Sequence, residues 1–217
     1  KVAVIQHLDE LTEEARIIGA VNTVVRQGER LIGGNTDGKG FLRGVRKDAG
    51  VDPAGKRVVL LGAGGAARAI ATELALAGIA HLTVVNRSAD RAGAMIGDLR
   101  RHTAVPIAYE RWDETYRVPG DTDLVVNATS IGLYPAVDAM PNVDLSGAGP
   151  GTLVADAVFN PPETRLLAAA RKQGLPTLDG LSMLVYQGVI GFEMWTGQSP
   201  DETVMKKSLE EALGVSQ

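Results

Sequence analysis

The hydrophobic residues of this chain fall into short runs that are separated by stretches with helical periodicity. Residues 57–61 form a Val- and Leu-rich run, an alanine-rich helical stretch follows, and a second apolar run covers residues 82–85. Gly78 stands between them, where a glycine commonly ends a helix. Similar apolar runs at residues 123–127 and 153–157 alternate with further helical stretches. This alternation predicts an α/β fold with a Rossmann-type, doubly wound parallel sheet.

The parts of the chain on either side of this region carry other patterns. Residues 135–151 are rich in Pro, Gly and Asp and predict a loop. After it, two helical patterns at residues 182–195 and 200–213 close the chain. Ahead of residue 57 the spacing predicts a helix at residues 11–19, a hairpin with strands at 21–26 and 31–33, and a helix that starts at the polar turn 34–38 and reaches about residue 48.

A glycine-rich turn joins the first strand of the predicted sheet to its helix. Gly62 permits a sharp turn, Gly64 lets backbone amides approach a pyrophosphate, and small residues near Ala67 let the helix pack closely on the strand. This arrangement predicts a dinucleotide site. We expect the turn to contact the cofactor through Gly62, Ala63, Gly64, Gly65 and Ala66.

The residues after the second strand indicate which dinucleotide binds. An NAD site usually has Asp or Glu at this place, about 20 residues after the glycines, to accept hydrogen bonds from ribose hydroxyls. This chain has Asn86, Arg87 and Ser88 there, and Arg91 follows one helical turn later. Guanidinium groups bind phosphate oxygens through paired, charge-assisted hydrogen bonds, so the sequence favours NADP over NAD. In the alternative interpretation, Ser88 only caps the next helix and the arginines are solvated.

The composition limits the other classes of function. Of the 217 residues, 45% are hydrophobic and 22% are charged, which is typical of a folded globular protein. The chain has no cysteine and three widely spaced histidines, so we expect no metal site. A net charge of −4 without a basic run argues against nucleic acid as a partner. No apolar stretch approaches the about 20 residues of a membrane span, and we expect a cytoplasmic protein that acts on a small molecule.

Four further motifs surround the glycine turn. They are Gly19-Ala20-Val21-Asn22-Thr23, Gly34-Asn35-Thr36-Asp37-Gly38, Asn127-Ala128-Thr129-Ser130-Ile131-Gly132, and residues 179–188, Asp-Gly-Leu-Ser-Met-Leu-Val-Tyr-Gln-Gly. In this combination and order the chain resembles shikimate dehydrogenases over essentially its whole length. The resemblance implies an NADP-dependent enzyme that interconverts 3-dehydroshikimate and shikimate, as a monomer or homodimer. An S-adenosylmethionine-dependent methyltransferase is disfavoured, because it would leave Arg87 and Arg91 without a purpose.

The resemblance also implies a catalytic pair, Lys1 and Asp37. Family members begin with several dozen more residues, which carry a Ser-x-Ser motif and an Asn-Val-Thr-x-Pro-x-Lys segment, and Lys1 matches the lysine that ends this segment. Oxidation of a secondary alcohol needs a base within hydrogen-bond reach of the hydroxyl, and Lys1 is the candidate. Asp37 would orient Lys1 and accept from a substrate hydroxyl. The alternatives are a solvated lysine and a turn aspartate that caps the following helix.

Other site residues follow from the same resemblance. Asn22 and Gln187 are expected to bind substrate hydroxyls together with Asp37, since an amide both donates and accepts. Met183 is the weakest cofactor candidate, because a methionine at helical spacing is more often part of the core. The resemblance places residues 1–42 in a smaller substrate-binding domain, 43–180 in the Rossmann domain and 181–217 in helices that return to the smaller domain. The further cofactor contacts expected near the nicotinamide are Thr129, Ser130, Ala157, Gly180 and Met183.

One position departs from the family pattern. The family usually has tyrosine in an Asp-x-x-Tyr-Asn-Pro stretch, whereas this chain has Phe159 there, so the hydroxyl that would touch substrate is absent. The loss of one hydrogen-bond donor typically weakens binding by about 0.5 to 1.5 kcal/mol. Phe159 therefore leaves three alternatives open: quinate as substrate, aminoshikimate as substrate, and a catalytically silent protein that binds NADP.

Overall fold

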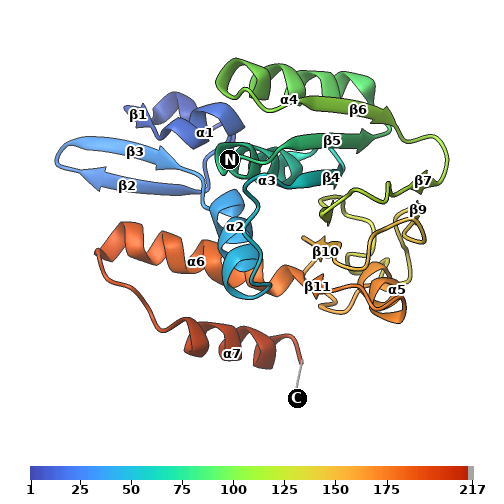
Figure 1. Ribbon diagram of the computed structural model, residues 1–217. Coiled ribbons are helices and arrows are strands. Elements are labelled where there is room, and N and C mark those ends of the chain that lie inside the picture. The colour runs from blue at the N-terminus through green and yellow to red at the C-terminus, as the bar shows by residue number, and fades with distance from the viewer. Residues whose placement is uncertain (215–217) are drawn as a thin grey trace.

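The computed structural model, which describes residues 1–214, is built around a parallel sheet of six strands (Figure 1). The strand order is β11-β10-β8-β4-β5-β6. The chain moves outward from β4 in one direction and from β8 in the other, so the order reverses between these two strands. The predicted doubly wound sheet is confirmed. Its strands are β4 (Arg57–Leu61), β5 (His81–Asn86), β6 (Ile107–Arg111), β8 (Leu124–Asn127), β10 (Leu153–Asp156) and β11 (Thr177–Leu178).

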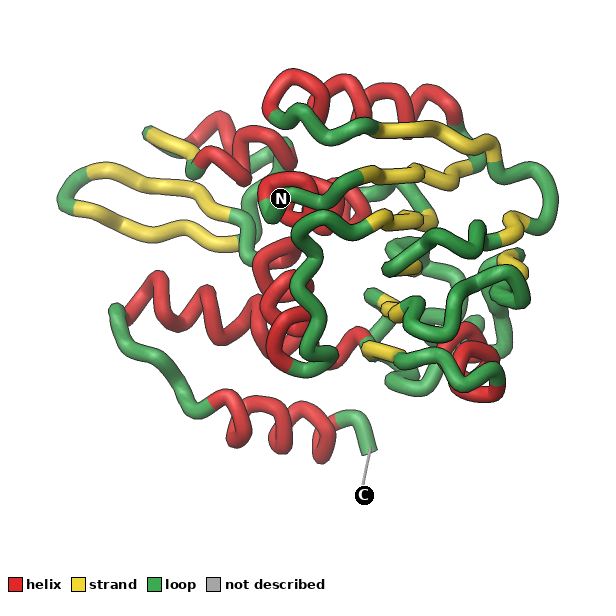
Figure 2. The backbone as a smooth tube through the Cα atoms, viewed as in Figure 1, coloured by secondary structure: helices red, strands yellow, loops and turns green. Residues whose placement is uncertain are grey.

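Helices cover both faces of this sheet (Figure 2). In β4, Val58 and Leu60 belong to a core with helices α3 (Gly65–Leu76) and α4 (Ala89–His102), whereas Val59 and Leu61 belong to a second core with α5 (Arg165–Lys172). Successive side chains of a strand point to opposite faces, so a strand that is buried on both faces is apolar throughout. This accounts for the continuous Val and Leu run of the sequence.

A smaller sheet precedes the large one. Its order is β1-β3-β2, with β3 antiparallel to β2 across a turn in which Gly28 has a φ of 62°. The helix predicted at residues 11–19 is confirmed but shorter, because the Thr12 hydroxyl caps it and Gly19 ends it in the left-handed conformation. The elements of this part are η1 (Ile5–His7), β1 (Glu10–Leu11), α1 (Glu13–Ile18), β2 (Thr23–Gln27) and β3 (Arg30–Gly34).

Helix α2 (Asp37–Lys47) links the two sheets and lies between α3 and α6 (Gly180–Thr196), with α7 (Glu202–Ala212) on the outer side of α6 (Figure 1). Its glycines permit close contact on both sides. A Cβ at Gly40 would lie 2.6 Å from the backbone nitrogen of Gln187, and a Cβ at Gly44 would lie 2.9 Å from the Ser182 Cβ. Residues 42 and 43 lie within this helix, and the division into domains at residues 42 and 180 stays a prediction.

The sequence patterns missed several short strands. Strand β6 lies at the edge of the large sheet and buries Ile107 while it exposes Glu110 and Arg111, so it lacks the apolar run of the central strands. Two more strands pair outside the sheet and have only two residues each, β7 (Tyr116–Arg117) and β9 (Val143–Asp144). Strand β9 falls within the loop predicted at residues 135–151.

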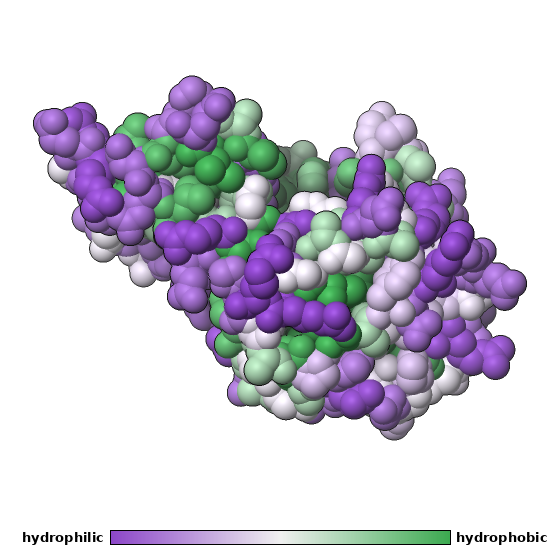
Figure 3. Space-filling model, turned by 90° about the horizontal axis from the view of Figure 1, so that it is seen from above, coloured by the Kyte–Doolittle hydropathy of each residue, from purple (hydrophilic) through white to green (hydrophobic). Residues whose placement is uncertain are grey.

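The surface is divided into two parts with a notch between them (Figure 3). Apolar residues gather on the part at the left, which is the side where the β2–β3 hairpin extends in Figure 1. Leu31 of β3, in this hairpin, is 39% exposed. Within residues 1–214, none of the helices combines the length and the apolarity that a bilayer crossing requires. The same residues contain no cluster of three or more side chains suited to hold a metal ion.

One acidic residue is buried where three helices meet. The Glu73 side chain on α3 is 6% exposed, and its Oε1 has no hydrogen-bond partner among the described residues. Burial raises the pKa of Glu73 to about 7; Glu14 raises this pKa further, while Lys39 and Arg46 lower it. Lys39 of α2 forms an ion pair with Glu14 of α1 at 2.8 Å, and a Cβ at Gly38 would lie 2.7 Å from the Glu73 Cγ.

Glu73 makes stability depend on pH. A glutamate in an unfolded chain has a pKa of about 4.3, so between that pH and about 7 the folded state holds the Glu73 proton more tightly than the unfolded state does. The free energy of unfolding should fall as the pH rises through this window, by up to ~3 kcal/mol, and stay low above it. Glu73→Gln, which is neutral at every pH, should therefore be more stable than the wild type at pH 8 and nearly equal to it at pH 4.5.

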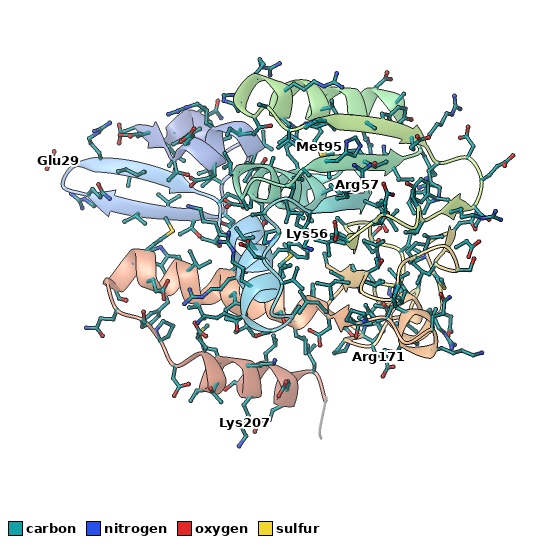
Figure 4. The ribbon with its side chains drawn as sticks, viewed as in Figure 1. Glu29, Lys56, Arg57, Met95, Arg171 and Lys207 are labelled. Carbon is teal, nitrogen blue, oxygen red and sulfur yellow. The ribbon has the colours of Figure 1, made fainter. Side chains whose placement is uncertain are left out.

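Urea unfolding at both pH values measures this difference. Glu29→Gln is the matched control, because Glu29 is exposed at the tip of the β2–β3 hairpin and points away from the molecule (Figure 4). An equal effect of Glu73→Gln at pH 4.5 and pH 8 would contradict the assignment.

Candidate functional site

The glycine turn lies at the point where the strand order of the large sheet reverses. Gly62, directly after β4, has a φ of 108°, a conformation that only glycine adopts easily. A Cβ at this position would lie 3.0 Å from the Thr129 Cγ2 and 3.1 Å from the Ala128 carbonyl oxygen, both after β8. The loops after the two central strands therefore touch. The crevice at this point is the usual ligand site of an open α/β sheet.

The start of α3 fits a pyrophosphate. Gly64 is the N-cap of this helix and supplies no side-chain cap, and the first intrahelical bond runs from the Arg68 N–H to the Gly64 carbonyl. Gly64 and Gly65 are exposed, and a Cβ on either would meet no atom within 4 Å. Packing within the protein does not require glycine here, whereas a ligand that approaches the free N–H groups does.

Of the residues after β5, some form hydrogen bonds within the protein and others have exposed side chains without an ion-pair partner among residues 1–214. Asn86 Nδ2 donates to the Ser88 carbonyl at 2.8 Å, and the Ser88 hydroxyl accepts from the Arg91 backbone N–H at 3.3 Å as the cap of α4. The capping role considered for Ser88 is therefore present. The side chains of Arg87 and Arg91 are exposed and form no ion pair with any carboxylate of residues 1–214. Both guanidinium groups are free to bind a phosphate.

Arg87 also lines a cavity of about 240 Å³ at the carboxyl ends of β5, β6 and β8. Ile131, after β8, and Trp112, after β6, also line this cavity, and the Trp112 indole nitrogen donates to the Asn142 carbonyl at 3.0 Å. The cavity holds two carboxylates, of which Asp113 is paired with Arg111 at 2.5 Å and Glu114 is exposed.

A buried pair that the sequence did not reveal holds the ends of β8 and β10 together. Asn127 Nδ2 donates to Asp156 Oδ1 at 2.9 Å, and Asn127 Oδ1 accepts from the Thr129 hydroxyl at 2.7 Å. Asp156 also accepts from the Val158 N–H and from the Thr164 hydroxyl that caps α5. Burial raises the pKa of Asp156 to about 6, although these hydrogen bonds lower it. This pair fixes the loop that carries Thr129.

The residues expected to form the catalytic pair lie in contact. The Lys1 ammonium donates to Asp37 Oδ2, and the Lys1 carbonyl accepts from the Val21 N–H at 3.0 Å. Asp37 is the first residue of α2 and mostly buried, whereas the Lys1 side chain is half-exposed. An ammonium that faces the outside and is held by a more buried carboxylate is suited to exchange a proton with a bound hydroxyl.

Asn22 joins this pair from the end of the smaller sheet. Its Nδ2 donates to Asp37 Oδ1 at 2.9 Å and to the Thr36 hydroxyl at 3.0 Å. Its Oδ1 accepts from the Thr36 N–H at 2.9 Å and from the Thr23 hydroxyl at 3.1 Å. All four hydrogen-bonding positions of the amide are thus used within the protein.

Gln187 of α6 reaches the same group through Thr36. The Thr36 hydroxyl donates to Gln187 Oε1 at 3.5 Å, and Gln187 Nε2 donates to the Leu184 carbonyl at 3.0 Å. The turn itself is fixed by Asn35, whose Oδ1 accepts from the Asp37 N–H at 3.0 Å and whose Nδ2 donates to the Ala20 carbonyl at 3.1 Å. Asn35 and Thr36 are 3% and 1% exposed, and no sequence pattern indicated a role for either residue.

The remaining expected residues lie along the ends of β8 and β10 and at the start of α6. Ala157 donates through its N–H to the Asn127 carbonyl at 2.8 Å. Met183 packs against the core that includes α3, which agrees with the alternative that this methionine is a core residue. Gly180 begins α6, where a Cβ would lie 2.8 Å from the Phe159 nitrogen. The Phe159 side chain is 37% exposed, and Ser130 is exposed. Among residues 1–214, no hydrogen bond or ion pair joins these residues to Lys1 or Asp37, and their cofactor and substrate roles stay predictions.

Two family models match the chain. The model described as Shikimate / quinate 5-dehydrogenase matches residues 45–135, and the Shikimate 5'-dehydrogenase C-terminal domain matches residues 180–210. A protein of Moorella thermoacetica named shikimate dehydrogenase (NADP(+)) is 45% identical over 218 residues, which cover 100% of this chain and 73% of that protein.

Two solved structures also resemble the chain in both fold and sequence. The 5-ketofructose reductase of a Gluconobacter strain, in its ligand-free form, has a TM-score of 0.92 and 51% identity over 98% of this chain and 76% of its own. The shikimate 5-dehydrogenase of Listeria monocytogenes, in complex with shikimate and NAD, has a TM-score of 0.89 and 32% identity over 96% of this chain and 74% of its own.

The predicted Rossmann-type fold and the predicted family are confirmed. The predicted dehydrogenase activity and the cofactor NADP agree with the name of the Moorella relative. Since two family models match and the relatives extend over nearly all of its length, the chain belongs to the shikimate/quinate dehydrogenase family.

Proposed function

We propose that this protein is an NADP-dependent oxidoreductase that interconverts 3-dehydroshikimate and shikimate. The observation that carries the proposal is the Lys1–Asp37 pair, held by Asn22 at the start of α2. The name of the Moorella relative supports both the substrate and NADP, and the Listeria enzyme, solved with shikimate and NAD, supports the substrate. When bound, the nicotinamide cofactor supplies or accepts the hydride.

The residues of this chain handle the proton. Lys1 donates it to the carbonyl oxygen in the direction of reduction and accepts it from the hydroxyl in the direction of oxidation. Asp37 holds the ammonium through Oδ2 and is held in turn through Oδ1, so Lys1 keeps one orientation. The free N–H groups at the start of α3 bind the pyrophosphate, and Arg87 and Arg91 bind the 2′-phosphate.

Asp37→Asn tests the catalytic pair. The amide keeps the size of the side chain but loses the charge that holds the ammonium, so kcat should fall about 100-fold or more while the KM of NADP stays within twofold. Steady-state kinetics of the natural full-length protein measure both values. Asp201→Asn is the matched control, because Asp201 caps α7 at another helix start. Turnover of Asp37→Asn at the wild-type rate would refute the assignment of the pair.

Arg87→Ala tests the choice of cofactor. The loss of a guanidinium that pairs with phosphate should raise the KM of NADP about 10- to 100-fold and leave the KM of NAD nearly unchanged. Arg111→Ala is the control, because Arg111 carries the same charge but is paired with Asp113, which lines the same cavity as Arg87. If both variants raise the KM of NADP equally, the effect comes from general charge and the Arg87 contact is wrong.

A second candidate function is the reduction of 5-ketofructose. Two observations favour it: the 51% identity to a 5-ketofructose reductase, and Phe159 in place of the family tyrosine. Both candidates share the fold, the cofactor turn and the handling of a hydroxyl proton. The two candidate substrates differ in shape and polarity, and we expect Phe159 to contact the part of the substrate where they differ.

A substrate panel with Phe159→Tyr separates the candidates. The panel measures kcat/KM for shikimate, quinate, aminoshikimate and 5-ketofructose. Each substrate is measured once with NADP(H) and once with NAD(H) as the cofactor. If shikimate is the substrate, the added hydroxyl should raise its kcat/KM up to about tenfold. A wild type that prefers 5-ketofructose, and loses that preference in Phe159→Tyr, would favour the second candidate. Binding of NADP without any turnover would favour the silent protein.

The cytoplasmic location and the monomeric or homodimeric state belong to the same proposal. Both rest on the sequence composition and on the family resemblance. Sedimentation of the purified protein measures the oligomeric state.

A further inference from the structure

The Thr36 hydroxyl occupies an unusual position for a helix cap. Thr36 is the N-cap of α2, where a threonine hydroxyl commonly accepts a hydrogen bond from an N–H of the first turn. Here it makes no such bond. Asn35 takes part of that role, since its Oδ1 accepts from the Asp37 N–H. The Thr36 side chain is 1% exposed, so its hydroxyl must be satisfied by protein groups.

Two side-chain amides bind this hydroxyl. It accepts from Asn22 Nδ2 at 3.0 Å, so its own proton is directed elsewhere, and the acceptor is Gln187 Oε1 at 3.5 Å. The second proton of Asn22 Nδ2 goes to Asp37 Oδ1 at 2.9 Å. A single chain of hydrogen bonds therefore runs from the Asp37 carboxylate through Asn22 and Thr36 to α6.

The chain of hydrogen bonds fixes which way both amides face. Asn22 must present its nitrogen to Asp37, because its oxygen is engaged by the Thr36 N–H and the Thr23 hydroxyl. Gln187 turns its oxygen toward Thr36 and uses one N–H on the Leu184 carbonyl, which leaves its second N–H for a ligand. A flipped Gln187 would place its Oε1 against the Leu184 carbonyl oxygen, and neither of these two acceptors carries a proton.

We propose that Thr36 is a positioning residue, whose hydroxyl links the Asn22–Asp37 group to Gln187. It holds the Asn22 amide on the Asp37 carboxylate and sets the orientation of the Gln187 amide for the substrate. Asn22 then acts mainly on the Asp37 carboxylate, and Gln187 presents an N–H rather than an oxygen to a substrate hydroxyl. The polar side chains of α2 and α6 are thereby joined in one hydrogen-bonded group. The proposal rests on the proposed function, because the substrate contacts define its effect on the rate.

Thr36→Val and Thr36→Ser test this link. Valine keeps the shape and removes the hydroxyl, so kcat/KM for the carbonyl substrate should fall about tenfold or more, with the KM of NADP within twofold. Serine keeps the hydroxyl and should retain at least half of the wild-type kcat/KM. Equal losses in both variants, or no loss in Thr36→Val, would overturn the proposal.

Thr152→Val is the matched control for a purely structural loss. Thr152 is likewise 1% exposed, and its hydroxyl donates to the Thr122 carbonyl at 2.7 Å, at the amino end of β10. It should lower the stability and leave kcat/KM unchanged. If Thr152→Val and Thr36→Val reduce kcat/KM alike, the role of Thr36 is only structural.

A readout without turnover separates this proposal from the proposed function. In ¹⁵N-labelled protein, Thr36→Ser should keep the side-chain amide signals of Gln187 near their wild-type positions, whereas Thr36→Val or Thr36→Ala should shift them. Unshifted signals in the variants without a hydroxyl would overturn the link. A wild type that turns over no substrate of the panel would overturn the proposed function and leave this test in force.

Discussion

The site depends on the close packing of α2 between α3 and α6. A side chain at Gly38 would collide with the Ala69 backbone of α3, and one at Gly40 would lie 2.6 Å from the Gln187 nitrogen of α6. Because no flexible side chain lies between the backbones of α2 and its neighbours, α2 cannot shift without a collision, and its position is fixed. Asp37 begins α2 and Gln187 lies on α6, so the same contact sets the distance between a proposed catalytic carboxylate and a proposed substrate amide.

The cofactor side of the site obeys a different constraint. The strand order reverses between β4 and β8, so the loops that follow them meet, and Gly62 leaves room for Thr129. Thr129 is held by Asn127, which is held by Asp156 at the end of the next strand. These hydrogen bonds form a buried polar network that holds the loops in place, and each side chain in it has a hydrogen-bond partner. Burial raises the pKa of Asp156 to about 6, and the three donors offset only part of this effect.

Local patterns predicted much of this structure, and long-range contacts account for what they missed. Gly62 and the apolar run before it identify a strand and a turn because their requirements lie in adjacent residues. Thr36 looks like an ordinary cap in the sequence, and only the fold brings Gln187, 151 residues away, to its hydroxyl. Asn127 and Asp156 each begin a motif that is visible in the sequence, and each accepts from the N–H two residues further on. Their contact with each other spans 29 residues and comes from the pairing of β8 with β10. Polar residues at the ends of two apolar runs that are expected to pair are the signal that could have found it.

Family membership settles the chemistry of the reaction more firmly than the substrate. An ammonium held by a carboxylate can exchange a proton with any secondary alcohol that a nearby nicotinamide oxidises, so Lys1 and Asp37 do not distinguish shikimate from another polyol. Selection therefore belongs to other groups. The structure shows one connection between the position that departs from the family pattern and a proposed substrate residue: the Phe159 backbone lies against Gly180, the first residue of the helix that carries Gln187. A change in the loop of Phe159 can therefore be passed to Gln187 through α6, while Asp37 stays fixed at the start of α2.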